Sequence, residues 1–294
     1  MGIRYRITHE TAYRYAAPVS VSRHVLHLRP RTCEWQRVLT AALDVTPAPS
    51  ARRDREDMFG NPETRMSFDA AHDQLTVLSR LDVDVAARPW AGRSSEGPAW
   101  EVVRDSLRFG GAAPLDPCRF GFESPHIRVK NELAEFARPS FLPGRPLLAA
   151  TADLTARIHR EFRYDPQATQ VGTSVMDVLA RRRGVCQDFA HLAIGCLRSL
   201  GLAARYVSGY LCTEPPPGQP RLTGADASHA WFALYCPASG WVEFDPTNDC
   251  EADQRHVLVA WGRDFADVSP LRGVIRGGGG HSLSVRVSVI PAGE

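Results

Sequence analysis

Cys186 begins the segment CQDFAHLAIGCLRSLG (186–201), in which apolar residues recur at helical spacing. A thiol in the first turn of a helix lies beside unpaired backbone N–H groups and the positive end of the helix dipole. Both favour the thiolate, the nucleophilic form of cysteine, and the same amides can stabilise a developing oxyanion. Taken alone, Cys186 could equally be a small apolar residue at a helix start. Chemistry requires a base elsewhere in the chain.

His229 is the candidate base. Most of the ten histidines lie where a structural role is expected, and His191 lies more than one helical turn beyond Cys186. His229 instead opens the segment HAWFALYC, which predicts a strand, after a long loop rich in Pro and Gly. Strand ends beside long loops are where functional sites are commonly built. The sequence therefore predicts His229 as the partner of Cys186.

Asp245 is the candidate group that orients the imidazole. It ends the next predicted strand, WVEFD, because Pro246 cannot continue a hydrogen-bonded ladder. If paired residue numbers across the short PASG hairpin sum to about 476, Asp245 faces Trp231 and His229 is its diagonal neighbour on the same face. An odd sum would place His229 and Asp245 on opposite faces of the sheet. The proposed site therefore requires a hairpin loop with an odd number of residues, three or five. Cys186, His229 and Asp245 would then be nucleophile, base and orienting carboxylate.

The segments around these residues predict an α+β core over residues 91–294. VKNELAEFARPSF and PLLAATADLTARIHREFRYD have helical spacing, and TSVMDVLARRRG offers Thr173 or Ser174 as N-cap and Gly184 as stop. Strands follow residue 201, so helices are expected to pack on a mostly antiparallel sheet. The apolar face of the Cys186 helix is expected to comprise Phe189, Leu192, Ala193, Cys196, Leu197 and Leu200.

Residues 1–90 predict a separate β-rich domain. IRYRITHETAYRY alternates large and polar residues, and further short runs rich in Val and Leu are separated by Pro, Asp and Gly turns. This spacing favours a small sandwich. The Pro/Gly/Ser-rich stretch 86–99 is typical of a domain boundary, and the four glycines at 277–280 are expected to be a flexible connector.

Composition narrows the partners and the compartment. A net charge of +2 disfavours nucleic-acid or membrane-surface partners, and the arginine clusters Arg52-Arg53 and Arg181-Arg182-Arg183 are expected to be solvated. The chain has no run of about 18 apolar residues and no apolar leader, so a membrane span and secretion are not expected. Seven widely spaced cysteines favour thiols in the cytoplasm. The absence of C-x-x-C disfavours a zinc site, whose ligands would have to be distant Cys and His residues.

Three blocks, GVCQDFAHL, ASHAWF and WVEFDPT, resemble those of the transglutaminase-like superfamily. This papain-type group includes transglutaminases, bacterial cysteine-protease-like proteins and, more distantly, arylamine N-acetyltransferases. The first 85 or so residues resemble the β-rich domain that precedes the core in bacterial members, and residues 262–279 resemble the stretch that follows it. The resemblance implies a papain-like core with Cys186 as nucleophile, His229 as general base and then acid, and Asp245 as orienting group. It also implies no metal and no organic cofactor.

The expected function is attack on an amide bond, peptide or isopeptide, through a thioester acyl-enzyme. Hydrolysis, as in a protease or amidase, and transfer to an amine, as in a transglutaminase, share the first half of the reaction and both stay open. The substrate would be a peptide or protein. The alternative is a non-catalytic peptide-binding or assembly module on the same fold. The loop at 213–228, which precedes His229, is expected either to shape substrate entry or to be a solvated hairpin loop. The sequence leaves the oligomeric state open.

Overall fold

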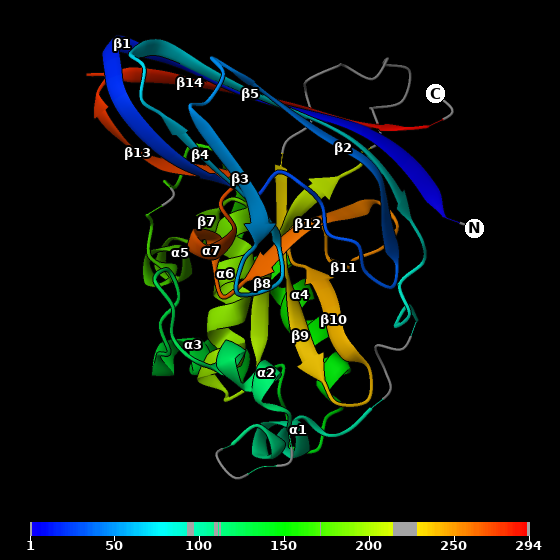
Figure 1. The fold of residues 1–294 in the computed structure, drawn as a ribbon. Coiled ribbons are helices and arrows are strands. Elements are labelled where there is room, and N and C mark those ends of the chain that lie inside the picture. Colours follow the sequence, from blue (N-terminus) through cyan, green and yellow to red (C-terminus); the bar gives the residue numbers. More distant parts are fainter. Residues whose placement is uncertain are drawn as a thin grey trace, which may run out of the picture.

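The computed structural model describes residues 2–92, 97–108, 111, 113–170, 172–213 and 228–292. It confirms a mixed α+β architecture in which a curled antiparallel sheet lies beside a core of helices and a second sheet (Figure 1). No helix within the described ranges is both long enough and apolar enough to cross a membrane.

The curled sheet is organised around one long strand, β1 (Ile3–Leu26). The first half of β1 pairs with β5 and β14, and its second half pairs with β4 and β13. The sheet is a single curled sheet with one apolar cluster of its own, which contains Leu26, Leu43, Met66, Phe68, Leu75 and Val77. The other strands of this sheet are β2 (Gln36–Thr46), β3 (Ala51–Glu56), β4 (Pro62–Phe68), β5 (His72–Val85), β13 (Leu271–Gly277) and β14 (His281–Pro291).

The two ends of the chain meet in this sheet. The division into residues 1–90 and 91–294 remains a prediction, but β13 and β14 do not pair with the core sheet that precedes them in sequence; both pair with β1. The expectation of a flexible connector at 277–280 is wrong. Gly277, Gly278 and Gly279 have positive φ, which glycine adopts without steric cost, and the amide of Ala16 donates to the carbonyl of Gly280 at 2.8 Å. The four glycines therefore form a hydrogen-bonded turn.

The core sheet is antiparallel, in the order β11-β10-β9-β8-β12. Helix α6 (Cys186–Ser199) packs on β8 and β9, and α3, α4 and α5 pack around α6. The strands are β8 (Ala204–Leu211), β9 (Ser228–Cys236), β10 (Gly240–Asp245), β11 (Cys250–Glu251) and β12 (His256–Gly262), with the short parallel pair β6 (Arg163–Tyr164) and β7 (Arg183–Gly184). The other helices are α1 (Trp100–Ser106), α2 (Leu115–Cys118), the 3₁₀ turn η1 (Arg119–Gly121), α3 (Asn131–Ala137), α4 (Leu147–Glu161), α5 (Val175–Arg181) and α7 (Phe265–Val268).

The local predictions for α5 and α6 are largely confirmed. Ser174 caps α5 by accepting the amide of Asp177 at 3.1 Å, but α5 ends at Arg181 instead of continuing to Gly184. It stops because Arg182 adopts φ +53°, a left-handed conformation that cannot extend a helix. Of the predicted apolar face of α6, only Leu200 is partly rather than fully buried, because it follows the end of the helix; Phe189, Leu192, Ala193, Cys196 and Leu197 are buried.

A buried ion pair joins the segment after β5 to the core sheet. Nη2 of Arg88 donates to the carbonyl of His256 at 2.8 Å and lies 3.4 Å from Oε2 of Glu243. Both charged side chains are fully buried. The same Oε2 accepts the indole N–H of Trp231, which lies on β9 two residues after His229. Breaking such a pair leaves a charge buried without its partner, which costs far more than breaking an exposed pair.

Arg88→Met is therefore expected to lower the free energy of unfolding by about 3–5 kcal/mol, because it leaves the Glu243 carboxylate buried alone. Arg37→Met is the matched control: it removes an exposed pair with Asp84 and should cost about 1 kcal/mol or less. Urea unfolding of both variants measures the difference. Equal costs would show that the buried pair does not hold the two parts of the fold together.

Candidate active site

Cys186 is the first residue of α6, directly after β7. The first helical hydrogen bond runs from the amide of Phe189 to the carbonyl of Val185 at 3.1 Å, so the amides of residues 186–188 precede the ladder. The carboxylate of Asp188 folds back and accepts the amide of Val185 at 2.8 Å. Gly184 makes room for it, since a Cβ there would lie 2.7 Å from Oδ2 of Asp188. This local structure fixes the turn that carries the thiol.

The hairpin of β9 and β10 has the register that the site requires. Paired residue numbers sum to 476, as for Trp241 with Tyr235, and the loop between the strands has three residues, 237–239. His229 and Asp245 therefore lie on the same face. Nε2 of His229 is 2.7 Å from Oδ2 of Asp245. The structure thus brings together the base and the orienting carboxylate that the sequence predicted.

The imidazole of His229 links the carboxylate to the thiol. Because Nε2 is held by Asp245, Nδ1 is the ring nitrogen left for Cys186. Burial would lower the pKa of His229, but hydrogen bonds to Asp245 and Cys186, together with their charges, outweigh it and raise the pKa to about 9. The imidazolium form, which stabilises a neighbouring thiolate, is therefore the favoured one at neutral pH.

Asp245 is fully buried and is surrounded by hydrogen-bond donors. Oδ1 accepts the amide of Thr247 at 2.9 Å, and Oδ2 accepts from Asn248 Nδ2 at 2.6 Å and from His256 Nε2 at 3.1 Å, in addition to His229. Burial would raise the pKa of this carboxyl, but the bonds from His229 and His256 outweigh it and hold the pKa well below the usual range. The carboxylate thus stays charged inside the protein.

His256 and Asp253 continue the chain of charges and were not predicted from the sequence. Nδ1 of His256 lies 3.2 Å from Oδ1 of Asp253. Burial would lower the pKa of His256, but hydrogen bonds to Asp245, Asp253 and Cys250 raise it to about 10. His256 opens β12, which β9 and β8 separate from β10 in the sheet order, so no pairing register could have placed its side chain beside Asp245.

Two aromatic residues border the site. The ring of Trp231 stacks on His229 with centroids 5.9 Å apart, and it meets His256 edge-on at 5.2 Å. Tyr164 is about half exposed, and its pKa is raised, first by burial and then by the charge of Cys186. It ends β6, which pairs with the strand that leads into Cys186. Tyr164 is thus an exposed aromatic beside the thiol. The predicted loop at 213–228 falls almost wholly outside the described residues.

His229, Asp245 and His256 also have the residue types of a metal site, with ligand atoms within 4.8 Å of one another. The sequence had disfavoured zinc because suitable ligands were distant in the chain, and the fold brings these three together. The 2.7 Å separation of His229 and Asp245 is that of a charge-assisted hydrogen bond. Donors around a tetrahedral zinc ion with bonds of about 2.0–2.1 Å stand more than about 3 Å apart. The geometry fits a triad better than a zinc site.

Comparisons with known proteins match both parts of the chain. Residues 5–84 match the bacterial transglutaminase-like N-terminal region, and residues 136–246 match the transglutaminase-like superfamily. The second match contains Cys186, His229 and Asp245. An uncharacterized protein of Mycobacterium tuberculosis is 43% identical over 296 residues, which cover 98% of this chain and 93% of that protein.

Two further proteins show more distant similarity. A protein-glutamine gamma-glutamyltransferase of Pseudomonas aeruginosa is 31% identical over 118 residues, which cover 39% of this chain and 17% of that enzyme. The solved structure of a candidate cysteine protease from Cytophaga hutchinsonii superposes with a TM-score of 0.78 at 22% identity, covering 100% of this chain and 92% of that one. At this identity the superposition shows a shared fold.

Iodoacetamide at about pH 6 is expected to label Cys186 at least tenfold faster than Cys118, because the imidazolium of His229 stabilises the Cys186 thiolate. Cys118 is the matched control, since it is also partly buried but its thiol donates to the backbone carbonyls of Leu107 and Pro114. In His229→Ala the difference should disappear. Peptide mass spectrometry of timed samples measures both rates, and equal rates in the unaltered protein would contradict an activated thiolate.

Stability should depend on pH through His229 and His256. Their pKa values of about 9 and 10 lie above that of a histidine in the unfolded chain. Their contribution to the free energy of unfolding is therefore fully present below about pH 6.5 and is lost as pH rises toward 10. Each contributes a slope of up to about 1.4 kcal/mol per pH unit in this window. Urea unfolding from pH 6 to 10 should therefore show a shallower loss of stability in His256→Gln. Parallel curves would show that His256 is neutral in the folded protein.

Proposed function

The chain belongs to the transglutaminase-like superfamily, and from that premise we propose that it is an enzyme that attacks an amide bond through the thiolate of Cys186. The observation that carries this proposal is the 2.7 Å hydrogen bond between Nε2 of His229 and Oδ2 of the buried Asp245. Because this bond uses Nε2, the other ring nitrogen, Nδ1, is the one left for the thiol. Burying a histidine together with a carboxylate costs free energy of folding, and a role in catalysis explains why the protein contains such a pair.

In the proposed first step the thiolate adds to the amide carbonyl carbon and forms a C–S bond, which leaves a negative charge on the oxygen. Backbone amides in the first turn of α6 stabilise this oxyanion. The intermediate collapses, the C–N bond breaks, and the departing nitrogen takes the proton from the imidazolium of His229. The products are a free amine or ammonia and a thioester on Cys186.

In the second step His229 accepts a proton from water or from an amine as it attacks the thioester. The C–S bond breaks and Cys186 is restored as the thiolate beside an imidazolium. Water gives hydrolysis and an amine gives transamidation, so the acceptor that reaches the thioester decides the reaction class. Asp245 holds the imidazole orientation in both steps and stays ionised.

Tyr164 supports a peptide or protein as the proposed substrate, because an exposed aromatic beside the thiol can pack against an extended chain. Catalysis is proposed to require no metal and no organic cofactor, since a thiolate and an imidazolium supply both nucleophile and acid. We also propose a cytoplasmic location, which is supported by the fact that all seven cysteines are thiols.

The proposal is tested by incubating the protein with casein and a fluorescent primary amine, and with casein alone. Transamidation attaches the amine to glutamine side chains, amidase activity releases ammonia, and proteolysis shortens the chain. Any of these should fall by at least about 10³-fold in Cys186→Ala and in His229→Ala, because each removes a reacting group. Asp245→Asn should retain part of the activity, since it perturbs only orientation and charge.

Cys118→Ala is the matched control and should retain full activity, because this thiol lies outside the site. Intact-protein mass spectrometry with an activated ester should also show one acyl group on the enzyme, which Cys186→Ala abolishes. Full turnover by Cys186→Ala would refute the mechanism. Retained peptide binding with no acyl adduct from any ester or amide would favour the alternative, a non-catalytic binding module.

A further inference from the structure

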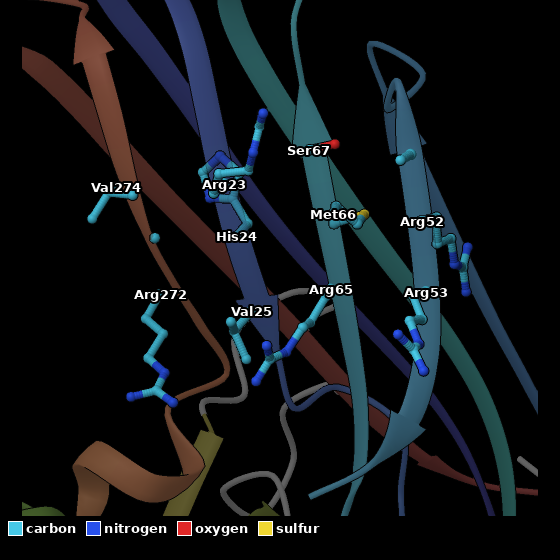
Figure 2. Close-up of a pocket in the computed structure, with 12 residues that line it drawn as sticks. Arg23, His24, Val25, Arg52, Arg53, Arg65, Met66, Ser67, Arg272 and Val274 are labelled. Carbon is cyan, nitrogen blue, oxygen red and sulfur yellow. The ribbon is translucent and has the colours of Figure 1, made fainter.

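A groove on the curled sheet lies outside the candidate active site. It has a volume of about 620 Å³ and crosses four strands in the order β13, β1, β4, β3. Figure 2 shows arginine side chains from all four of these strands around it. The sequence predicted only that Arg52 and Arg53 are solvated, and it gave no sign that the other arginines join them.

The strand register arranges the groove in rows. Arg272 pairs with Val25, Val25 pairs with Arg65, and Arg65 pairs with Arg53. Directly paired residues point to the same face of a sheet, so these four side chains form one row across the strands. With about 4.8 Å between neighbouring strands, the three steps from Arg272 to Arg53 span about 14 Å. Figure 2 shows the same order from left to right.

The charges in this row are only partly compensated. Nε of Arg65 donates to Oε1 of Glu63 at 2.8 Å. Neither Arg53 nor Arg272 has a side-chain hydrogen bond or ion pair to any residue in the described part of the chain. Arg53 also stands directly opposite Arg65, and like charges in this position destabilise a sheet. An anion placed between the guanidinium groups would remove that repulsion and pair with the two uncompensated cations.

The floor between the arginines is aliphatic. Val25 lies in the row between Arg272 and Arg65, and Val274 in the neighbouring row is 71% exposed. Apart from His24, whose side chain is buried, none of the lining residues within the described part of the chain is aromatic. Single-stranded nucleic acids are usually held by aromatic residues on which bases stack, so this floor favours an aliphatic ligand. The small net charge of +2 also disfavours a nucleic-acid partner.

We propose that this groove binds an extended acidic segment of a partner polypeptide. In an extended chain, residues i, i+2 and i+4 point to one side, and i and i+4 are about 14 Å apart. Carboxylates at i and i+4 therefore match Arg272 and Arg53. An aliphatic residue at i+2, about 7 Å from either end, lies between Val25 and the stem of the Arg65 side chain. The segment crosses the strands of the sheet. This inference does not depend on the proposed catalytic activity.

The test uses the Cys186→Ala protein, so that catalysis cannot consume the probe, and a fluorescent peptide Gly-Glu-Ser-Val-Ser-Glu-Gly. Fluorescence anisotropy at low ionic strength should detect binding that weakens as salt is added. Introducing both Arg53→Glu and Arg272→Glu into the Cys186→Ala protein should weaken binding of the peptide at least about tenfold, because two attractive charge pairs become repulsive. Adding Arg14→Glu and Arg160→Glu changes the net charge equally at exposed positions outside the groove and should change affinity less than about twofold.

Peptide variants test the spacing on the unaltered arginines, so the result does not rely on a substituted sheet. Gly-Glu-Ser-Val-Glu-Ser-Gly, with glutamates on opposite sides of an extended chain, should bind at least about tenfold more weakly, as should the peptide with both glutamates replaced by glutamine. The proposal would be overturned if the protein bound neither peptide, or if it bound the peptides with the two glutamate spacings equally well. It would also be overturned if the Arg53/Arg272 and Arg14/Arg160 double variants lost the same affinity. Tighter binding of oligothymidylate or phosphatidylglycerol vesicles through Arg53 and Arg272 would overturn it in favour of a nucleic acid or a lipid surface.

Discussion

The buried carboxylate of Asp245 is the constraint on which the site depends. An isolated charge in the interior is strongly unfavourable, so a carboxylate with no exposed surface must be surrounded by donors. Thr247, Asn248, His256 and His229 supply them, and each bond also restricts the position of its donor. The stabilisation of one charge thus orients the imidazole. Because Asp245 holds Nε2 of His229, Nδ1 is the ring nitrogen that remains for Cys186.

The rest of the core keeps the thiol and the imidazole on separate rigid elements. Cys186 starts a helix whose buried face packs on β8 and β9, and His229 lies on β9 itself. Asp188 and Gly184 determine the path of the chain into the helix, while Trp231 packs against His229 from the same strand. Because Trp231 also donates to Glu243, the ion pair with Arg88 connects this part of the site to the segment that follows the curled sheet.

The curled sheet shows how a surface can arise from segments that are distant in sequence. The arginine row combines β13 near the end of the chain with β1, β4 and β3 near its beginning. Arg53 and Arg272 are separated by more than two hundred residues, yet three strand spacings separate them across the sheet. Within β13, β4 and β3 each arginine of the row is an exposed residue, which is typical of a solvated face, so no strand taken alone carries information about the row.

The sequence by itself determined the local chemistry. The helix start at Cys186 and the strand ends at His229 and Asp245 follow from periodicity and turn residues, which act over short stretches of chain. The even pairing sum of the β9–β10 hairpin did not follow from the sequence, because the PASG turn is compatible with more than one loop length. Only the tertiary structure decided that His256 lies beside Asp245, that Arg88 pairs with Glu243, and that β13 and β14 pair with β1. These contacts join residues whose separation in sequence sets no register between them. These contacts are stabilised by the burial of paired charges and of sheet faces, and that burial is reached only when the whole chain has folded.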